Sequence, residues 1–432
     1  MTAPRVDVLV LGAGMGGLSA AALLARKGLK TLVAERLPRI GGRCSTLDYK
    51  GFKCTTGVIG VELGGVVENL FRTVGAKFDV REAGAPHYLI DGRTVEVPPK
   101  GGLKTLLAAA SDDEGEIDRV LRAFSAAMRT TGFSEEVCLK DWLLRHTRND
   151  AILRIFQTMV SATLLVNTHE LPAREFFAFI KKLGGVKRFG YCPGGSIDLA
   201  RALAEKICDF GGEVRTSAPA RRILVEEGRA RGAVLSKDGA DVEVRASVVI
   251  SNIGPLRTLQ LAGEENFTGT YVDDVRQNGV PAVVVAVHMS SDEPLIEHDH
   301  LLITGAQSVN ALYQPTVVCP ELAPAGTHMI LAGGGPRSSL PPLDTKRVLE
   351  ACFADLNDLI PDFARRVKIL LTGTFHRTWP GMHCWPGKDV PQETPVKGLY
   401  QVGDGAKPSG TTGLPSAVES GMMVAEAVSG LR

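Results

Sequence analysis

A glycine-rich turn near the N-terminus and an acidic residue beyond it carry the clearest chemistry in the chain. Gly12 permits a sharp turn, Gly14 lets the backbone approach a phosphate without an intervening Cβ, and Gly17 allows a following helix to pack closely. The free N–H groups of that helix can bind a pyrophosphate, and Glu35 can accept both hydroxyls of an adenosine ribose. We therefore predict dinucleotide contacts from Gly12, Gly14, Met15, Gly16, Gly17, Glu35 and Arg36.

The segments around these residues have the patterns of the elements that must position them. Residues 6–11 are apolar apart from Asp7, as in a parallel strand covered on both faces. Apolar residues then recur at helical spacing up to the stop signal Gly28, and residues 30–34 form a second strand just before Glu35. This order makes a chance glycine-rich turn the weaker explanation, although it does not by itself separate NAD from FAD.

Two further glycine-rich blocks suggest a ligand that extends past the first pyrophosphate. Gly42 and Arg43 follow Glu35 closely, and Arg43 could pair with a phosphate; the alternative is a surface turn with a solvated arginine. Near the C-terminus, a buried strand over 399–402 leads into Gly403 and Asp404, whose carboxylate could accept a ribityl hydroxyl. A final helix begins after Gly410, and the dipole at its N-terminus would stabilise a reduced flavin. The alternative is that this C-terminal block is a plain strand and helix with no ligand contact. The predicted contacts of the final helix are Thr412, Gly413 and Leu414.

Together these blocks resemble the FAD-dependent amine oxidase and phytoene desaturase superfamily, and most closely its phytoene desaturase, carotenoid isomerase and retinol saturase branch. Pro193-Gly194-Gly195-Ser196 and the C-terminal block carry the resemblance besides the N-terminal motif. Members usually have an acidic residue shortly before the glycine at position 57, where this chain has Thr55 and Thr56. The resemblance implies FAD as the cofactor and covers the flavin domain.

The predicted fold class is α/β (α+β overall), with a Rossmann-like FAD-binding domain and an inserted substrate domain of mixed sheet and helices. The FAD-binding pieces are residues 1–75, 190–255 and 395–432, and the substrate-binding pieces are 76–189 and 256–394. Predicted elements are a hairpin over 87–97, helices over 103–185, a meander over 223–245, and strands over 282–289 and 328–332.

The resemblance implies an FAD-dependent oxidoreductase that moves hydride to or from flavin N5, across a C–C bond of an apolar isoprenoid or alicyclic substrate. Two alternatives stay open. The first is an amine oxidase, since Trp379 and Trp385 could imitate the pair of aromatic rings that cages the amine in such enzymes. The second is a non-catalytic escort of prenylated GTPases. Lys407 could act as an acid or base at the flavin edge, or be a solvated loop lysine. Cys384 could attach the flavin, although an ordinary thiol is favoured; Tyr191 and His376 are further candidate lining residues.

Composition limits the partners and the location. Lys plus Arg number 49 against 48 Asp plus Glu, and a net charge of +1 argues against nucleic-acid binding. Eight scattered cysteines and the lack of a long apolar stretch predict a cytoplasmic protein. No metal site is expected, because residues 297–300 have the pattern of a solvated loop. Residues 176–182 set aromatics beside two lysines, which permits peripheral membrane contact, although a buried helix with a charged end is favoured. The electron acceptor and the oligomeric state stay open.

Overall fold

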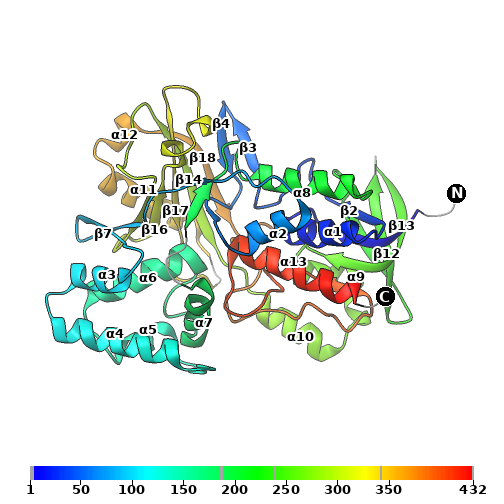
Figure 1. The fold of residues 1–432 in the computed structure, drawn as a ribbon, viewed down its shortest axis with the longest axis horizontal. Helices are drawn as coiled ribbons and strands as arrows, with labels where there is room; N and C mark the ends of the chain where they lie inside the picture. The colour runs from blue at the N-terminus through cyan, green and yellow to red at the C-terminus, as the bar shows by residue number, and fades with distance from the viewer. Residues whose placement is uncertain (1–3, 185–187, 238, 341–342, 431–432) are drawn as a thin grey trace.

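Two seven-stranded sheets, each covered by helices, build the two halves of the molecule (Figure 1). The computed structural model describes residues 4–184, 188–237, 239–340 and 343–430. A flavin half lies on the right of Figure 1 and a substrate half on the left, and the chain passes between them more than once. The predicted class, a Rossmann-like domain with an inserted domain of sheet and helices, is confirmed.

The flavin half is centred on parallel strands in the order β10, β2, β1, β13 and β19. β13 is long enough to serve two sets of neighbours: its first part pairs antiparallel with the meander strand β12, and its last residues run parallel between β1 and β19. The strands are β1 (Arg5–Leu11), β2 (Thr31–Ala34), β10 (Glu213–Arg215), β11 (Ala220–Glu226), β12 (Arg229–Lys237), β13 (Ala240–Ser251) and β19 (Leu399–Gln401).

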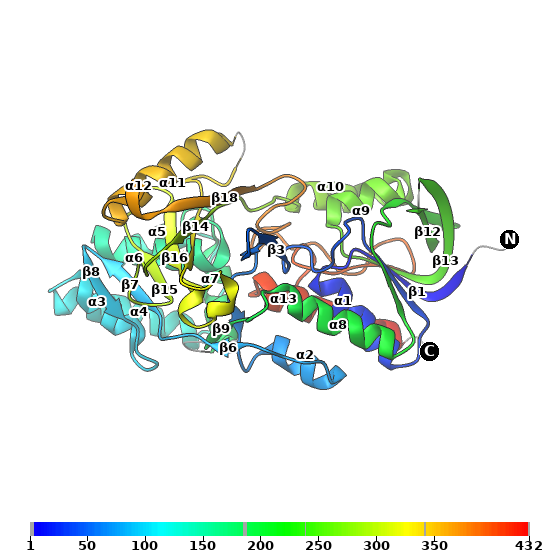
Figure 2. The ribbon, with the colours of Figure 1, turned by 90° about the horizontal axis from the view of Figure 1, so that it is seen from above.

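Helices cover both faces of this sheet (Figure 2). On one face lie α1 (Met15–Arg26), α8 (Ile197–Asp209) and α13 (Gly413–Ser429), with α2 (Val66–Val74) beside them. The other face carries α9 (Pro255–Ala262) and α10 (Gly269–Asn278). Leu261 and Ala262 of α9 are buried in the core of the flavin sheet, so this part of the predicted substrate-binding piece 256–394 packs on the flavin half.

The substrate half has a sheet in the order β18, β14, β17, β16, β15, β7 and β8. Along β14, Val285, Val287 and Met289 pack into a core with α11 (Thr345–Leu359), so the alternate residues of that strand face the other way. The predicted hairpin is confirmed by the pairing of β7 with β8. The strands are β7 (His87–Ile90), β8 (Arg93–Glu96), β14 (Val284–Ser291), β15 (His300–Ile303), β16 (Val309–Tyr313), β17 (His328–Gly334) and β18 (Lys368–Phe375).

Five helices form a second layer of the substrate half around an aromatic core. Phe177 packs edge-to-face on Trp142 and on Phe176, with ring centroids 4.9 and 5.3 Å apart. Phe176 and Phe177 are completely buried, so residues 176–182 belong to the buried helix with a charged end that the sequence favoured. No helix in the part of the chain that the structure describes is long and apolar enough to cross a membrane. The helices are α3 (Gly102–Ala110), α4 (Glu114–Arg129), α5 (Leu139–Leu144), α6 (Asp150–Leu164) and α7 (Ala173–Leu183).

Two small sheets accompany the larger ones. A hairpin pairs β3 with β4, and β9 pairs antiparallel with both β5 and β6. Their bounds, with those of the short α12, are β3 (Thr46–Tyr49), β4 (Phe52–Thr55), β5 (Val61–Glu62), β6 (Arg81–Glu82), β9 (Phe189–Tyr191) and α12 (Phe363–Arg366).

Candidate active site

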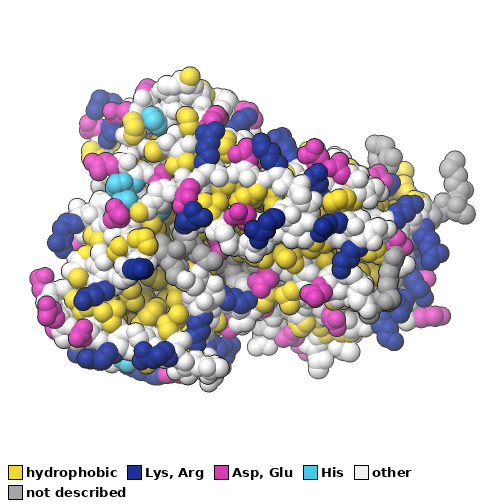
Figure 3. All heavy atoms as spheres, in the orientation of Figure 1, with side chains coloured by type: hydrophobic (Ala, Val, Ile, Leu, Met, Phe, Trp, Pro, Cys, Tyr) yellow, Lys and Arg dark blue, Asp and Glu magenta, His cyan; other side chains and the backbone are white. Residues whose placement is uncertain are grey.

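A cavity of about 1910 Å³ runs between the two halves. The carboxyl ends of β1 and β2 and the N-terminal ends of α1 and α13 line its flavin side. The inner face of the substrate sheet and its helical layer line the other side, and Figure 3 shows apolar side chains gathered over these helices. The cavity exceeds the roughly 300–1,000 Å³ of an ordinary ligand pocket, so it has room for a dinucleotide and a second molecule.

The turn before α1 is shaped to receive a pyrophosphate. Gly12 adopts a φ of +97°, and Gly14 caps α1 with no side-chain cap and no acidic residue in the first turn. A Cβ at Gly16 would lie 2.9 Å from the backbone nitrogen of Gly403, so the turn and the C-terminal block touch. Gly17 does not line the cavity; a Cβ there would lie 2.4 Å from the Gly12 oxygen, which fits its predicted packing role.

Glu35 is held rigidly at the end of β2. Its Oε2 accepts a hydrogen bond from the Ala13 N–H and its Oε1 from the Leu37 N–H, each at 2.8 Å. The residue is 6% exposed and lines the cavity together with Arg36. The carboxylate therefore fixes the phosphate turn and still faces the space where a ribose would lie.

Asn252 is a site residue that the sequence analysis missed. It follows β13, and with its amide oriented to satisfy both groups it donates to the Val402 oxygen at 3.3 Å and accepts from the Gly14 N–H at 3.1 Å. Its side-chain amide would meet a Cβ at Gly14, Gly16 or Gly403 at 2.5–2.9 Å. The signal was available, because ligands bind at the carboxyl ends of parallel strands and β13 is the neighbour of β1.

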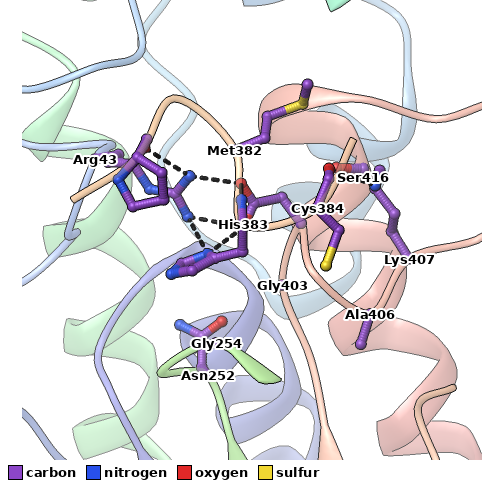
Figure 4. A network of polar contacts seen from close by, with 12 residues as sticks. Arg43, Asn252, Gly254, Met382, His383, Cys384, Gly403, Ala406, Lys407 and Ser416 are labelled. Atoms are coloured by element: carbon purple, nitrogen blue, oxygen red, sulfur yellow. Dashed lines mark hydrogen bonds and ion pairs between the residues drawn. The ribbon is translucent and has the colours of Figure 1, made fainter. Parts of the chain in front are cut away.

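Arg43 and Asp404 form a bidentate ion pair on the flavin side of the cavity, and Figure 4 shows the Arg43 side chain pointing toward His383. Arg43 Nη1 and Nη2 lie 2.5 and 2.7 Å from the two Asp404 oxygens. Nη1 also donates to the Gly381 oxygen at 2.9 Å. His383 Nδ1 lies 2.8 Å from Asp404 Oδ1, and the His383 N–H donates to Oδ2 at 3.2 Å. Arg43 thus pairs with Asp404, where the sequence had suggested a phosphate for one and a ribityl hydroxyl for the other.

This arrangement keeps Asp404 ionised. Burial works to raise the pKa of the carboxyl, but the charges and hydrogen bonds of Arg43 and His383 outweigh it and hold the pKa well below its usual range. All three residues line the cavity. The pair therefore joins the loop after Gly42 to the C-terminal block without leaving a net charge.

Two more loops complete the flavin side. The Thr56 hydroxyl donates to the Gly42 oxygen at 2.8 Å, so a hydroxyl beside Gly57 ties this loop to the one carrying Arg43. At the start of α13, Thr412 is the N-cap but makes no side-chain cap bond. Thr412, Gly413 and Leu414 all line the cavity. The open first turn of α13 can therefore stabilise negative charge there.

Comparison with known proteins shows the family to which the chain belongs. The sequence model of the family described as flavin containing amine oxidoreductase matches residues 15–429. The chain belongs to this family. An uncharacterized protein of Methanocaldococcus jannaschii is 25% identical over 416 residues, covering 93% of this chain and 94% of that protein. The 15-cis-phytoene desaturase, chloroplastic/chromoplastic, of Solanum lycopersicum is 24% identical over 466 residues, covering 98% and 77%. The crystal structure of an oxidoreductase from Methanosarcina mazei matches with a TM-score of 0.85 at 26% identity, covering 97% of this chain and 100% of that one.

This flavin-containing oxidoreductase uses FAD, and its residues fit that cofactor. A glycine cradle that a Cβ would fill, a carboxylate at the ribose position and two uncapped helix N-termini all face one cavity. The escort alternative is set aside, because the family to which the chain belongs is described as flavin containing amine oxidoreductase.

Three candidate site residues from the sequence analysis lie away from the cavity of this oxidoreductase. The Lys407 side chain is fully buried, pairs with Asp389 and donates to the Cys384 oxygen at 3.3 Å. Figure 4 shows Lys407 beyond Cys384, on the far side from Arg43. Trp385 donates its indole N–H to the Pro281 oxygen at 3.2 Å in the helical core. None of Lys407, Cys384 and Trp385 is among the described residues that line the cavity, whereas Trp379 and Tyr191 are.

The burial of Lys407 and Cys384 has consequences for their chemistry. Burial raises the pKa of the Cys384 thiol to about 12, against the lowering effect of Lys407, so the group is an unreactive thiol. The geometry offers Lys407 a structural role in its pair with Asp389 and no route to a molecule in the cavity. His376 does not line the cavity among the described residues either.

Proposed function

We propose that the chain moves hydrogen across a C–C bond of an apolar isoprenoid or alicyclic substrate. The observation that carries the proposal is the apolar lining of the substrate side of the cavity. An apolar wall favours binding of a hydrocarbon skeleton, because binding removes the apolar surface of the ligand from water. Residues that supply this wall include Leu103, Leu121, Phe124, Met159, Leu165 and Leu331.

The resemblance to the tomato phytoene desaturase over nearly the whole chain supports the same chemistry. When bound, FAD supplies a hydride acceptor or donor at N5. The chain's own residues hold that cofactor at the turn of α1, at Glu35 and beside the Arg43–Asp404 pair. The apolar walls orient the substrate and exclude water from it.

An amine oxidase is the less favoured candidate. Of the two tryptophans that could imitate an amine cage, Trp379 lines the cavity and Trp385 does not. Among the described lining residues, the carboxylates belong to neither the sheet nor the helices of the substrate half, so an ammonium would find no counter-ion there. Those carboxylates are Glu35, Glu62, Asp404 and Glu419.

The test is anaerobic spectroscopy of the FAD-loaded protein with matched panels of ligands. We expect isoprenoids or cyclic ketones with a saturated C–C bond to bleach the oxidised flavin, or their unsaturated counterparts to reoxidise flavin reduced with dithionite. Primary and secondary amines of similar size serve as the comparison panel and should leave the spectrum unchanged. Bleaching by amines alone would contradict the proposal.

A further inference from the structure

Four residues that face the cavity lie in one row across the substrate sheet. His288 on β14 and Tyr313 on β16 both lie opposite Leu331 on β17, and His300 on β15 lies opposite Tyr313. Residues directly opposite one another share a face of a sheet, and all four line the cavity. With neighbouring strands about 4.8 Å apart, the row is about 14 Å long. Three polar residues and Leu331 thus share one row in a wall that is otherwise largely apolar.

His288 is the unusual member of this row. The residue is 4% exposed, and neither of its buried ring nitrogens makes a hydrogen bond of good geometry with the residues that the structure describes, although the Thr55 backbone lies near the ring. Tyr313 is only partly buried, and its hydroxyl makes no hydrogen bond with the residues that the structure describes. Buried polar groups in native proteins nearly always have a partner, so the unpartnered His288 ring on the cavity wall points to a missing ligand.

The surroundings of His288 leave room for such a ligand. Ala286 precedes it on the same face of β14, and Gly333 lies opposite Ala286 on β17. Both small residues line the cavity on the same face of the sheet as His288. A ligand atom can therefore reach the ring from the cavity without displacing a large side chain.

The chemistry of the row selects a neutral group. Burial lowers the pKa of His288 to about 4, against a smaller raising effect of the Thr55 backbone, so at pH 7 the ring is neutral with one N–H donor and one nitrogen acceptor. The carboxylate that adjoins the row, Asp299, accepts from the Tyr191 hydroxyl at 3.1 Å and the Gly84 N–H at 3.1 Å. It also lies 2.9 Å from His300 Nδ1. Neither His288 nor Asp299 is left to balance a charged ligand.

We propose that this row binds a neutral oxygen function, a hydroxyl or a carbonyl, of an otherwise apolar substrate, with His288 as the principal contact and Tyr313 as the second. The inference rests on the proposed function, since it adds one polar group to the apolar skeleton proposed there. The substrate is then an oxygenated isoprenoid or alicyclic compound.

The test compares ligands that share one skeleton: farnesol, farnesal, β-farnesene, farnesylamine and farnesoic acid. Binding to the oxidised, FAD-loaded protein is measured from the flavin difference spectrum and by calorimetry. We expect farnesol or farnesal to bind about 10-fold or more tightly than β-farnesene, because a site with buried polar groups rejects an analogue that leaves them unpaired.

Each other outcome has a distinct meaning. Equal affinity for the alcohol, the aldehyde and the hydrocarbon would overturn this inference and leave the proposed function standing. Tightest binding of the amine or the acid would overturn it in favour of a charged ligand. If no member of the series binds, the apolar substrate class fails, and the inference fails with it.

Substitutions in the row test whether His288 and Tyr313 contact the ligand oxygen. His288→Phe keeps a ring and removes both nitrogens, so the preference for farnesol over β-farnesene should shrink to within about 3-fold; Tyr313→Phe should reduce it less. Leu331→Met changes the same row with little change of volume and should alter both affinities by the same factor. His288→Gln retains a donor and an acceptor, should keep the preference, and replaces His288→Phe if that variant does not fold. Full preference in His288→Phe would overturn the assignment.

Discussion

Replacing Asp404 with asparagine is the sharpest test of the flavin side of the cavity. The Asp404 carboxylate receives four contacts, two from the Arg43 guanidinium and two from His383, at 2.5–3.2 Å. Asparagine keeps the shape but turns one acceptor into a donor. The loop that carries Gly42 and Arg43 is then held less firmly to the strand end at Gly403.

The size of the effect follows from the burial of the pair. Removing one partner of a buried ion pair costs about 3–5 kcal/mol. The Arg43 side chain is 22% exposed and keeps its bond to the Gly381 oxygen, so we expect the lower end, about 3 kcal/mol, in the unfolding free energy of the apoprotein. If half of that loss also appears in cofactor binding, FAD affinity falls about 10-fold, since 1.4 kcal/mol is a factor of ten.

Asp389→Asn is the matched control. Asp389 also pairs with a cation in a partly buried site, the Lys407 ammonium, but neither residue is among the described residues lining the cavity. Both variants should unfold at lower urea concentration, and only Asp404→Asn should bind FAD more weakly in titrations of the apoprotein. Unchanged FAD affinity in Asp404→Asn, or an equal loss in both variants, would refute the reasoning.

Of four further predictions, one concerns the pH dependence of the Asp404 pair and three concern other parts of the structure. Glu35→Ala should lower the flavin-to-protein absorbance ratio and, by leaving the Ala13 and Leu37 N–H groups unpaired, destabilise the apoprotein by about 1–3 kcal/mol per group; full flavin occupancy would contradict the ribose assignment. Because the folded pKa of Asp404 lies below its unfolded value, the stability gap between wild type and Asp404→Asn should stay constant above about pH 5 and close as the pH falls below about 4; a gap that closes between pH 7 and 6 in urea titrations would refute this. Lys407→Met should lower stability yet leave the rate of flavin bleaching within about 2-fold, whereas slowing of about 100-fold would restore the acid–base role suggested by the sequence. With Phe176 and Phe177 buried, the protein should not float with liposomes at low salt; flotation would show that another surface binds lipid.

The features that could be predicted from the sequence are those in which the chemistry and the chain are local. The glycine turn, its strands and Glu35 lie within one short segment, and each residue has a conformational or chemical reason to be there. The hairpin at Asp91-Gly92 is equally local. The fold class followed from these signals together with the resemblance carried by the C-terminal block.

The remainder depends on contacts between distant segments. Arg43 and Asp404 are 361 residues apart, and the sequence around either residue does not predict contact with the other. Nearness in sequence to Asp404 suggests a flavin contact for Lys407, but in the structure the Lys407 side chain points toward Asp389 instead. His288 follows three valines and one alanine in its strand, where an isolated histidine gives no signal until its ring nitrogens are seen to lie at a cavity.

Asn252 makes the effects of substitutions at several glycines depend on one side chain. One side-chain amide stands within 2.5–2.9 Å of where a Cβ would lie at Gly14 or Gly16, in the turn at α1, and at Gly403 near the C-terminus. Gly14 has no positive φ, so the space filled by the Asn252 amide is a main obstacle to alanine there. In a mutational library, Gly14→Ala should therefore be deleterious alone and better tolerated after Asn252→Ala. The order in which such substitutions arise would decide which evolutionary paths stay open.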